Sequence, residues 1–299
     1  MLIHDALKRF TDYLKFEKRY SLHTLTAYSK DLEQFSVFIE KEFECTQVEE
    51  VIASFVRTWL ANIKDATDAE PKTINRKISS LKSFFKFLLR QQIISSNPMT
   101  TVVSQKQRKR LPQYIEKPDV EKLWRYTDFA DGWQGRTERL ILVLLYQTGM
   151  RLSELVNLKE RQVDASNLSL KILGKGNKER IIPCNRDLID ELNSYAADKR
   201  LTIENCNTEY LLVIESGKQL YPKWVYNTVR KYLDPATTIE KRSPHVFRHT
   251  FATHLLNEGA DLNAVKELLG HSSLASTQVY THNTIGKLKE VFKKAHPKA

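Results

Sequence analysis

The segments SPHVFR (Ser243–Arg248) and LLGHSSLASTQVY (Leu268–Tyr280) place two histidines, an arginine and a tyrosine close together in the chain. His245 and Arg248 are three residues apart at an expected helix start, and residues at this spacing share one face of a helix. An imidazole and a guanidinium can therefore bind the same anion. Tyr280 follows this cluster, and its phenolate is able to attack a phosphate held by those cations.

A second segment, LLYQTGMRLSEL (Leu144–Leu155), contains another arginine beside an expected helix end. The apolar run Leu140–Leu145 predicts a buried helix, and Gly149 predicts its end as a left-handed C-cap. Arg151 would then emerge between two helices, where its side chain can point into a cleft and Glu154 can orient it. A single arginine in such a place is more often a helix-capping or surface residue, so this segment alone assigns no function.

A third segment, NLSLKILGKGNKERIIP (Asn167–Pro183), reads as a β-hairpin. Leu168, Leu170 and Ile172 alternate at the period of a strand, Gly174–Asn177 has the composition of a turn, and an apolar strand follows. Lys175 would lie at the tip, where lysines are usually solvated. The GxxxxGK[ST] spacing of a P-loop is absent, which argues against nucleotide hydrolysis.

The order of these residues (Arg, hairpin Lys, His-x-x-Arg, His, Tyr) resembles the tyrosine recombinase (phage integrase) family, and its Xer-type members in particular. The matching strings are TGMRLSEL (148–155), LGKGNKERIIP (173–183), SPHVFRHTFATHLL (243–256) and LLGHSSLASTQVYTH (268–282). YSLHTLTAYSKDL (20–32) resembles the opening of the amino-terminal DNA-clamping domain, and KLKEVFKKAHPKA (287–299) resembles the family's tail. Phe247 stands where leucine is more usual, which leaves the chemistry unchanged.

The resemblance implies a mainly α fold with a small antiparallel β-sheet. Residues 1–99 would form a helical core-binding (SAM-like) domain that binds DNA, and residues 100–110 a basic linker. Residues 111–299 would form the catalytic domain with a C-terminal docking helix. The two domains would close around a duplex as a C-shaped clamp.

The resemblance also implies which groups hold the phosphate. Arg151 and Arg248 can each grip non-bridging oxygens bidentately, as a lysine cannot. His271 would donate a hydrogen bond to the same oxygens, and Glu154 would support Arg151. Two arginines would thus hold the charge of the transition state, and no metal, ATP or other cofactor is expected.

Three further residues would carry the bond exchange. Tyr280 would attack the phosphodiester and form a 3′-phosphotyrosyl enzyme with a free 5′-hydroxyl. His245 is the expected acceptor of the tyrosine proton, and Lys175 would protonate the departing 5′-oxygen. The sequence does not separate the proton-transfer roles of His245, His271 and Lys175.

The charge of the chain favours a polyanionic partner. Its 299 residues carry a net charge of +11, and the isoelectric point is near 9.4. Residues 1–70 have 9 Lys/Arg against 13 Asp/Glu, a net charge of −4, whereas residues 71–110 have 10 Lys/Arg and no acid, a net charge of +10. Positive charge concentrated in this way is typical of a surface that binds nucleic acid.

Within the basic region, Lys72–Gln92 predicts one amphipathic helix opened by Pro71. Apolar residues at helical spacing would face the core: Ile74, Ile78, Leu81, Phe85 and Leu88. The opposite stripe is expected to contact DNA phosphates, although an ordinary solvated face is the alternative: Lys72, Arg76, Lys86 and Arg90. Four linker residues are expected to cross the DNA backbone and could otherwise be read as a nuclear signal: Lys106, Arg108, Lys109 and Arg110.

The tail after Tyr280 predicts a short helix with an apolar stripe of Ile285, Leu288, Val291 and Phe292. A helix this short is marginal alone, so it must dock onto something. Packing on its own domain is one possibility. The resemblance favours docking into a neighbouring protomer, which would close a cyclic tetramer on two DNA duplexes, with copies of itself or of a related recombinase. A DNA translocase is a further possible regulator.

Other features narrow the function class. Charged residues interrupt any signal peptide and no stretch is long enough to span a membrane. Cys45, Cys184 and Cys206 are scattered, which fits a reduced cytoplasmic setting. No Cys pair or HExxH motif is present, so His249 and His254 are expected to pack or face DNA rather than bind a metal.

The expected function is therefore site-specific DNA recombination, with resolution of chromosome dimers at cell division as the expected role. A type IB topoisomerase shares the phosphotyrosyl chemistry, but the basic helix and the docking tail favour recombination. A mobile-element integrase is another alternative, although such chains often carry an extra N-terminal domain and this chain starts at the clamp domain. A non-enzymatic DNA-binding homologue is disfavoured, because none of the six catalytic-type positions is lost.

Overall fold

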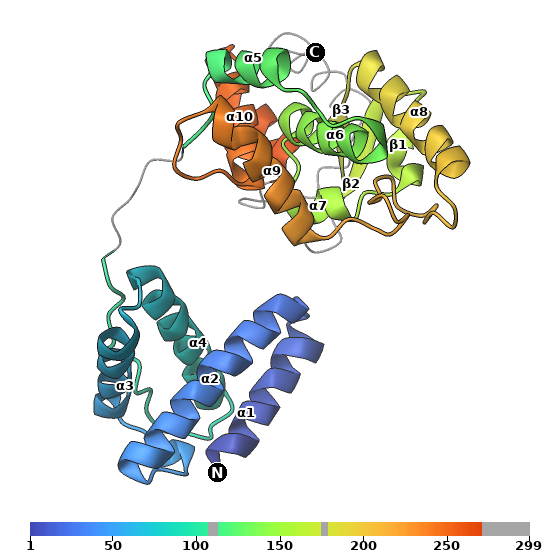
Figure 1. The fold of residues 1–299 in the computed structure, drawn as a ribbon. Helices are drawn as coiled ribbons and strands as arrows, with labels where there is room; N and C mark the ends of the chain where they lie inside the picture. Colours follow the sequence, from blue (N-terminus) through green and yellow to red (C-terminus); the bar gives the residue numbers. More distant parts are fainter. Residues whose placement is uncertain (107–112, 175–178, 271–299) are drawn as a thin grey trace. The chain divides into compact units, whose positions relative to one another are not determined.

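The computed structural model describes residues 1–106, 113–174 and 179–270. The chain divides into two compact units, Met1–Arg110 and Leu111–Ala299 (Figure 1). In the described parts of both units, no helix combines the length and apolar character needed to cross a membrane.

The N-terminal unit is a bundle of helices, as the sequence predicts. Its elements are α1 (Ile3–Asp12), the π-helical turn Tyr13–Glu17, α2 (Leu22–Phe43), the 3₁₀ turn Val48–Glu50, α3 (Ala53–Thr67) and α4 (Pro71–Arg90). Ser21 caps α2, because its hydroxyl accepts from the Thr24 N–H, and Pro71 occupies the first turn of α4. Aromatic rings fill the core, with Phe35 packed edge-on against Trp59 and Phe10 against Phe84.

Helix α4 confirms the predicted amphipathic pattern. The five apolar residues expected to face the core are all buried: Ile74, Ile78, Leu81, Phe85 and Leu88. Beyond the helix, the start of the expected linker lies against the same unit. Val102 is buried, and Gln105 exchanges two hydrogen bonds with the Asn75 side chain at 2.8 and 2.9 Å.

The C-terminal unit places helices around a small antiparallel sheet (Figure 1). Its elements are α5 (Lys117–Tyr126), α6 (Gly132–Thr148), α7 (Leu152–Val156), the 3₁₀ turn Glu160–Gln162, β1 (Val163–Asp164), β2 (Ser169–Leu173), β3 (Glu179–Pro183), α8 (Arg186–Thr202), α9 (Pro222–Ala236), α10 (Pro244–Asn257) and α11 (Leu262–Leu269). The strand order is β1-β2-β3. A mainly helical fold with a small antiparallel sheet is therefore confirmed.

The predicted hairpin is formed by β2 and β3, with Leu170 opposite Ile182 and Ile172 opposite Arg180. Two details differ from the expectation. The short strand β1 adds a third member, and Leu168 lies just outside β2 with a φ of 48°. Leu168 therefore turns the chain between β1 and β2 instead of continuing the alternation.

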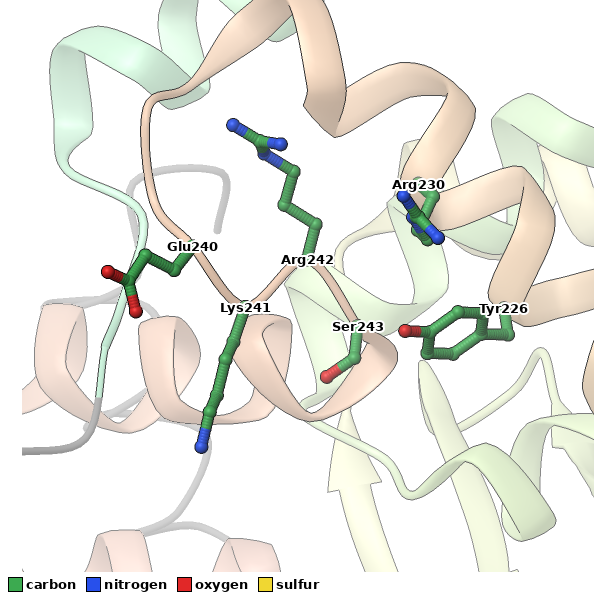
Figure 2. A pocket seen from close by; sticks show the side chains of 6 residues that line it. All are labelled: Tyr226, Arg230, Glu240, Lys241, Arg242 and Ser243. Atoms are coloured by element: carbon green, nitrogen blue, oxygen red, sulfur yellow. The ribbon is translucent and has the colours of Figure 1, made fainter. Parts of the chain in front are cut away.

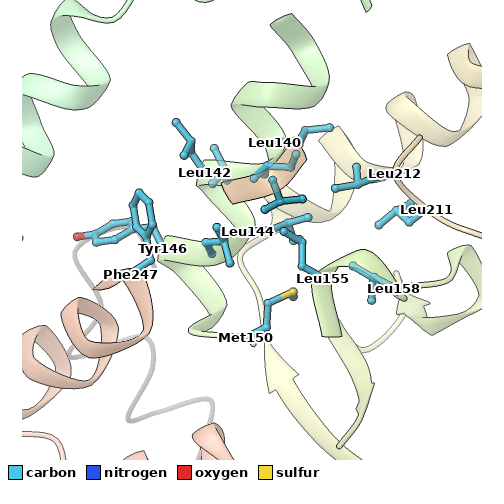
Figure 3. Close-up of a cluster of buried hydrophobic side chains, with 14 of the residues drawn as sticks. Leu140, Leu142, Leu144, Tyr146, Met150, Leu155, Leu158, Leu211, Leu212 and Phe247 are labelled. Atoms are coloured by element: carbon cyan, nitrogen blue, oxygen red, sulfur yellow. The ribbon is translucent and has the colours of Figure 1, made fainter. Parts of the chain in front are cut away.

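The core of this unit is centred on α6, whose residues from Leu140 to Thr148 are all buried. Leu155 and Leu158 belong to the same cluster as the α6 leucines, and Figure 3 shows Tyr146 beside Phe247 of α10. The helix ends at Gly149 in the left-handed conformation with φ 57°, and the Gly149 N–H bonds to the Leu145 carbonyl at 3.1 Å. This confirms the predicted C-cap, which turns the chain towards Arg151.

Candidate active site

Arg151 is the N-cap residue of α7, three residues beyond the end of α6. Its side-chain Nη1 donates to Glu154 Oε1 at 2.7 Å, and its main-chain N–H donates to Glu154 Oε2 at 2.7 Å. The Glu154 carboxylate thus holds both the backbone and the head group of Arg151. The Arg151 side chain is 31% exposed, which leaves its remaining N–H groups within reach of a ligand.

Arg248 lies in the first half of α10 and is buried. Its Nη1 donates to the Gly149 carbonyl at 2.8 Å and its Nη2 to the Leu269 carbonyl at 2.6 Å. Burial and the nearby charges of Arg151 and Arg180 lower the pKa of Arg248 to about 10, although Glu154 opposes that shift. The guanidinium therefore remains a cation at neutral pH.

Arg180 of β3 belongs to the same cluster, although the sequence interpretation did not single it out. It forms a bidentate pair with Glu154, from Nη1 to Oε1 and from Nη2 to Oε2, both at 2.8 Å. Its Nε donates to the Leu268 carbonyl at 2.8 Å. A sequence signal was available, because Arg180 and Ile182 share one face of β3 and Ile182 is a core residue.

All three arginines donate hydrogen bonds to the C-terminal end of α11. Three consecutive carbonyls accept from three different guanidinium groups: Leu268 from Arg180, Leu269 from Arg248 and Gly270 from Arg151, the last at 3.0 Å. The C-terminal end of a helix carries partial negative charge, which favours these contacts. The elements that position them are the start of α7, strand β3 and α10.

The charge of this arginine cluster (Arg151, Arg180 and Arg248) is not balanced within the described residues. Glu154 is its only carboxylate partner there, so the four groups sum to +2. A guanidinium has five N–H donors, and the described hydrogen bonds use two each on Arg151 and Arg248. Both arginines can therefore bind an anion, and a phosphate is an anion whose geometry matches guanidinium forks.

Histidines follow along α10. His245 is exposed at its start, one turn before Arg248 and on the same side of the helix, as the spacing predicts. His249 is also exposed at the surface. Its pKa is lowered by partial desolvation of the ring and, to a smaller extent, by the neighbouring His245 and Arg248. His254 is buried, with Nδ1 3.3 Å from the Tyr146 hydroxyl, so it is a packing residue as expected.

Three of the six predicted catalytic positions, Lys175, His271 and Tyr280, lie outside the described residues. The same holds for three linker residues, Arg108, Lys109 and Arg110, and for the tail from residue 283 onward. The nearest described residues to these positions are Gly174 and Glu179 on the hairpin and Gly270 after α11.

A basic hollow lies at the start of α10, next to the segment that carries His245. Figure 2 shows the residues that line it: Tyr226, Arg230, Glu240, Lys241, Arg242 and Ser243. The Tyr226 hydroxyl points towards Ser243. Arg242 is fixed by hydrogen bonds to Asp234 at 3.2 Å and to the Thr237 carbonyl at 3.1 Å. The lining contains three cations against Glu240, and the ion pair of Arg242 with Asp234 offsets a further part of this charge.

The four α4 residues predicted to contact DNA are all exposed: Lys72, Arg76, Lys86 and Arg90. Lys106 is exposed as well. Arg76 forms an ion pair with the buried Asp31 of α2, which also accepts from Lys77 at 3.1 Å and from Ser80 at 3.0 Å. The acid-free segment is therefore partly neutralised from another helix, and Arg76 contributes less net positive charge to this surface than its three neighbours.

Solved structures share this fold across nearly the whole chain. The XerH site-specific recombinase bound to a palindromic difH substrate, in a post-cleavage complex, matches with a TM-score of 0.71 and 20% identity, covering 96% of this chain and 82% of that chain. The Tn1549 transposon integrase in complex with transposon right end DNA matches with a TM-score of 0.70 and 18% identity, covering 97% of this chain and 99% of that chain. At this identity the likeness concerns the fold alone.

The sequence is much closer to curated relatives. A tyrosine recombinase XerC of Anoxybacillus flavithermus is 38% identical over 300 residues, covering 99% of each chain. Another XerC, of Listeria innocua, is 38% identical over 294 residues, covering 98% of this chain and 97% of the relative. Residues 113–286 match the phage integrase family, and residues 7–92 match the phage integrase N-terminal SAM-like domain. The chain therefore belongs to the phage integrase family, the tyrosine recombinases.

Proposed function

We propose that this protein is a Xer-type site-specific recombinase that cuts and rejoins DNA strands through a 3′-phosphotyrosyl intermediate. The arginine cluster is the observation that carries the proposal. Arg151 and Arg248 lie on one positively charged site with free N–H donors, and only Glu154 offsets the charge among the described residues. A phosphodiester brings the negative charge that such a site lacks.

The proposed chemistry is an exchange of one phosphate ester for another. The Tyr280 oxygen forms a bond to phosphorus while the bond from phosphorus to the 5′-oxygen breaks. His245 takes up the phenolic proton, and Lys175 delivers a proton to the departing 5′-oxygen. Arg151, Arg248 and His271 stabilise the charge on the non-bridging oxygens, where preorganised donors lower the barrier most. Attack by a 5′-hydroxyl from another strand then reverses the step and completes the exchange.

The proposed partner is a double-stranded DNA recombination site. The exposed lysines and arginines of α4 and the basic hollow beside α10 support phosphate contacts outside the reacting centre. The linker residues Lys106, Arg108, Lys109 and Arg110 would add to them. We further propose a cyclic tetramer on two duplexes, formed with itself or with a related recombinase, and regulation by a DNA translocase.

Full-length similarity to proteins named XerC supports a role in resolving chromosome dimers at cell division over a role in a mobile element. The cytoplasm is the proposed location. It is consistent with the free cysteines Cys45, Cys184 and Cys206.

A covalent-trapping experiment tests this function. Wild type and Tyr280→Phe are incubated in EDTA with a nicked suicide substrate that carries a candidate chromosomal recombination site. We expect wild type alone to form a covalent 3′-linked complex, whereas both proteins bind the DNA, because phenylalanine removes only the attacking oxygen.

An adduct formed by Tyr280→Phe would contradict the nucleophile assignment. Tight binding without an adduct by either protein, even after a partner-containing extract is added, would count against recombinase activity and favour a non-enzymatic DNA-binding protein.

A further inference from the structure

Arg180 lies where the hairpin, α7 and α11 meet. It comes from β3, the strand that begins four residues after Lys175, and its side chain is only 4% exposed. All three of its nitrogens have partners, because Nη1 and Nη2 bind the two oxygens of Glu154 and Nε binds the Leu268 carbonyl, each at 2.8 Å. The guanidinium plane is therefore fixed by two different elements.

Glu154 in turn accepts four hydrogen bonds, two on each oxygen. Arg180 supplies one to each oxygen at 2.8 Å, and the Arg151 side chain and main-chain N–H supply the others at 2.7 Å. A carboxylate has about four acceptor sites in its plane. Arg180 occupies the two that Arg151 does not use, so the direction of the Glu154 plane, and with it the place of Arg151, depends on Arg180.

Burial of Arg180 separates its role from that of Arg151. A side chain that is 4% exposed and bonded at all three nitrogens has little to offer a phosphate, whereas Arg151 is 31% exposed. The planar fork also explains why an arginine stands here. A lysine ammonium in its place would be a point charge and could not hold both carboxylate oxygens and a carbonyl in one plane.

We propose that Arg180 is a positioning residue for strand cleavage: it holds the Glu154 carboxylate and the end of α11 in place, so that Arg151 is presented to the scissile phosphate. This inference rests on the proposed function. It predicts a loss in the rate of the chemical step rather than a loss of DNA binding, because Arg180 itself does not reach the ligand.

The experiment compares full-length Arg180→Met with wild type in single-turnover cleavage of the nicked suicide substrate, with DNA affinity measured separately. Arg139→Met is the matched control, since Arg139 forms an ion pair with Glu191 on the surface of the same unit. We expect the cleavage rate of Arg180→Met to fall about a hundredfold, the cost of a misplaced catalytic group. DNA affinity should stay within a few fold, and Arg139→Met should match wild type in both.

The pH profile separates positioning from general damage to the fold. Burial favours the protonated form of Glu154, but the hydrogen bonds and charge of Arg180, with those of Arg151, hold the pKa of Glu154 below its ordinary value. The charged groups around this carboxylate are Arg151 at the start of α7, Arg180 of β3 and Arg248 of α10. Without Arg180 the carboxylate should take up a proton at higher pH, so the cleavage rate per folded molecule should fall more steeply below pH 7 in Arg180→Met than in wild type.

Two further variants test the same role if Arg180→Met folds poorly. Arg180→Lys retains the charge without the fork, so it should cleave slowly, with a pH profile between those of wild type and Arg180→Met. Gly270→Ala retains Arg180 but places a β-carbon 3.0 Å from Arg180 Cδ, at a φ of 63° that alanine adopts with strain. It should also slow cleavage, because it displaces the same side chain.

The outcomes distinguish the inference from the function on which it rests. If wild type forms no covalent complex, the proposed function fails. If wild type cleaves and folded Arg180→Met cleaves at the same rate and with the same pH profile, the positioning role alone is wrong. A rate loss that is fully accounted for by weaker DNA binding would also overturn it.

Discussion

Gly149 lies so close to Phe251 that a β-carbon on the glycine would be 2.6 Å from the phenyl Cδ1. The same position has a φ of 57°, and its carbonyl accepts from Arg248 at 2.8 Å. Gly149 thus ends α6 and, because it has no side chain, allows α10 to pack closely against that end. Its carbonyl also holds Arg248 of the candidate site.

Gly149→Ala should therefore lower the free energy of unfolding by about 2–4 kcal/mol, because displacing the packed ring costs about 1–3 kcal/mol and the left-handed backbone adds about 1 kcal/mol. Gly259→Ala is the matched control. Gly259 also has a positive φ, 84°, but nothing lies within 4 Å of an added β-carbon, so only the backbone strain of about 1 kcal/mol applies. Urea unfolding of both variants gives the comparison, and equal losses would mean that contact with Phe251 costs nothing.

Arg248→Ala should reduce single-turnover strand cleavage by about 10²–10³-fold, the usual effect of removing one donor to a developing oxyanion. DNA affinity should change much less, since many surface cations contribute to it. Arg248→Lys should recover only part of the rate, because an ammonium cannot grip two oxygens in a plane. Near-normal cleavage by Arg248→Ala would contradict the phosphate-holding role.

The stability of the C-terminal unit should depend on the protonation of His254. Burial is the main cause that lowers the pKa of His254, so the folded chain protonates this imidazole at a lower pH than the unfolded chain does. As the pH falls below about 6.5, His254 becomes protonated in the unfolded chain before it does in the folded chain. The free energy of unfolding therefore decreases as the pH falls, by at most about 1.4 kcal/mol per pH unit.

Urea unfolding between pH 5 and pH 8 measures this dependence. His254→Leu should flatten the acidic side of the profile. His249→Gln, on the exposed side of the same helix, should flatten it less. An unchanged slope in His254→Leu would show that another group is responsible.

DNA binding should distinguish Lys86 from Arg76 on α4. Lys86 has no ion-pair partner among the described residues, whereas Arg76 is paired with Asp31. Replacing a lysine that contacts a phosphate reduces the slope of log affinity against log salt by about one. Lys86→Gln should show this change and Arg76→Gln a smaller one. Identical slopes in Lys86→Gln and wild type would remove Lys86 from the DNA surface.

Truncation after Asn283 tests the role of the tail, which lies outside the described residues. The truncated chain should bind a single site but fail to assemble two sites into a synaptic complex, as measured by gel shift with two labelled duplexes. The double variant Lys289→Gln and Lys293→Gln leaves the apolar stripe intact and should still assemble. Normal assembly by the truncated chain would rule out docking between protomers.

Local sequence patterns predicted the elements that short-range chemistry controls. The end of α6 at Gly149 follows from a glycine after an apolar run, the β2–β3 hairpin from alternation around a turn, and the buried face of α4 from helical spacing. Each depends on residues within a few positions of one another. For the same reason the spacing of His245 and Arg248 placed both on one side of α10.

Contacts between distant parts of the chain were not predicted. Arg180 and Glu154 are 26 residues apart, and Arg76 and Asp31 are 45 apart, so no local pattern reports either pair. The count of charges along residues 71–110 missed Asp31 for this reason. The burial of Arg180 was not predicted, because a charged residue near the end of a strand usually faces solvent. The only sequence signal for burial is that Arg180 is two residues from Ile182 and therefore on the same face of the strand.

The three consecutive carbonyls at the end of α11 set a constraint on how this chain can vary in evolution. Leu268, Leu269 and Gly270 each serve an arginine that comes from a different element. An insertion or deletion of one residue between Leu262 and Gly270, within α11 and its C-cap, would shift every one of these pairings at once, whereas the loop before α11 could absorb one. Homologous chains should therefore keep the length of this interval even where its sequence has diverged.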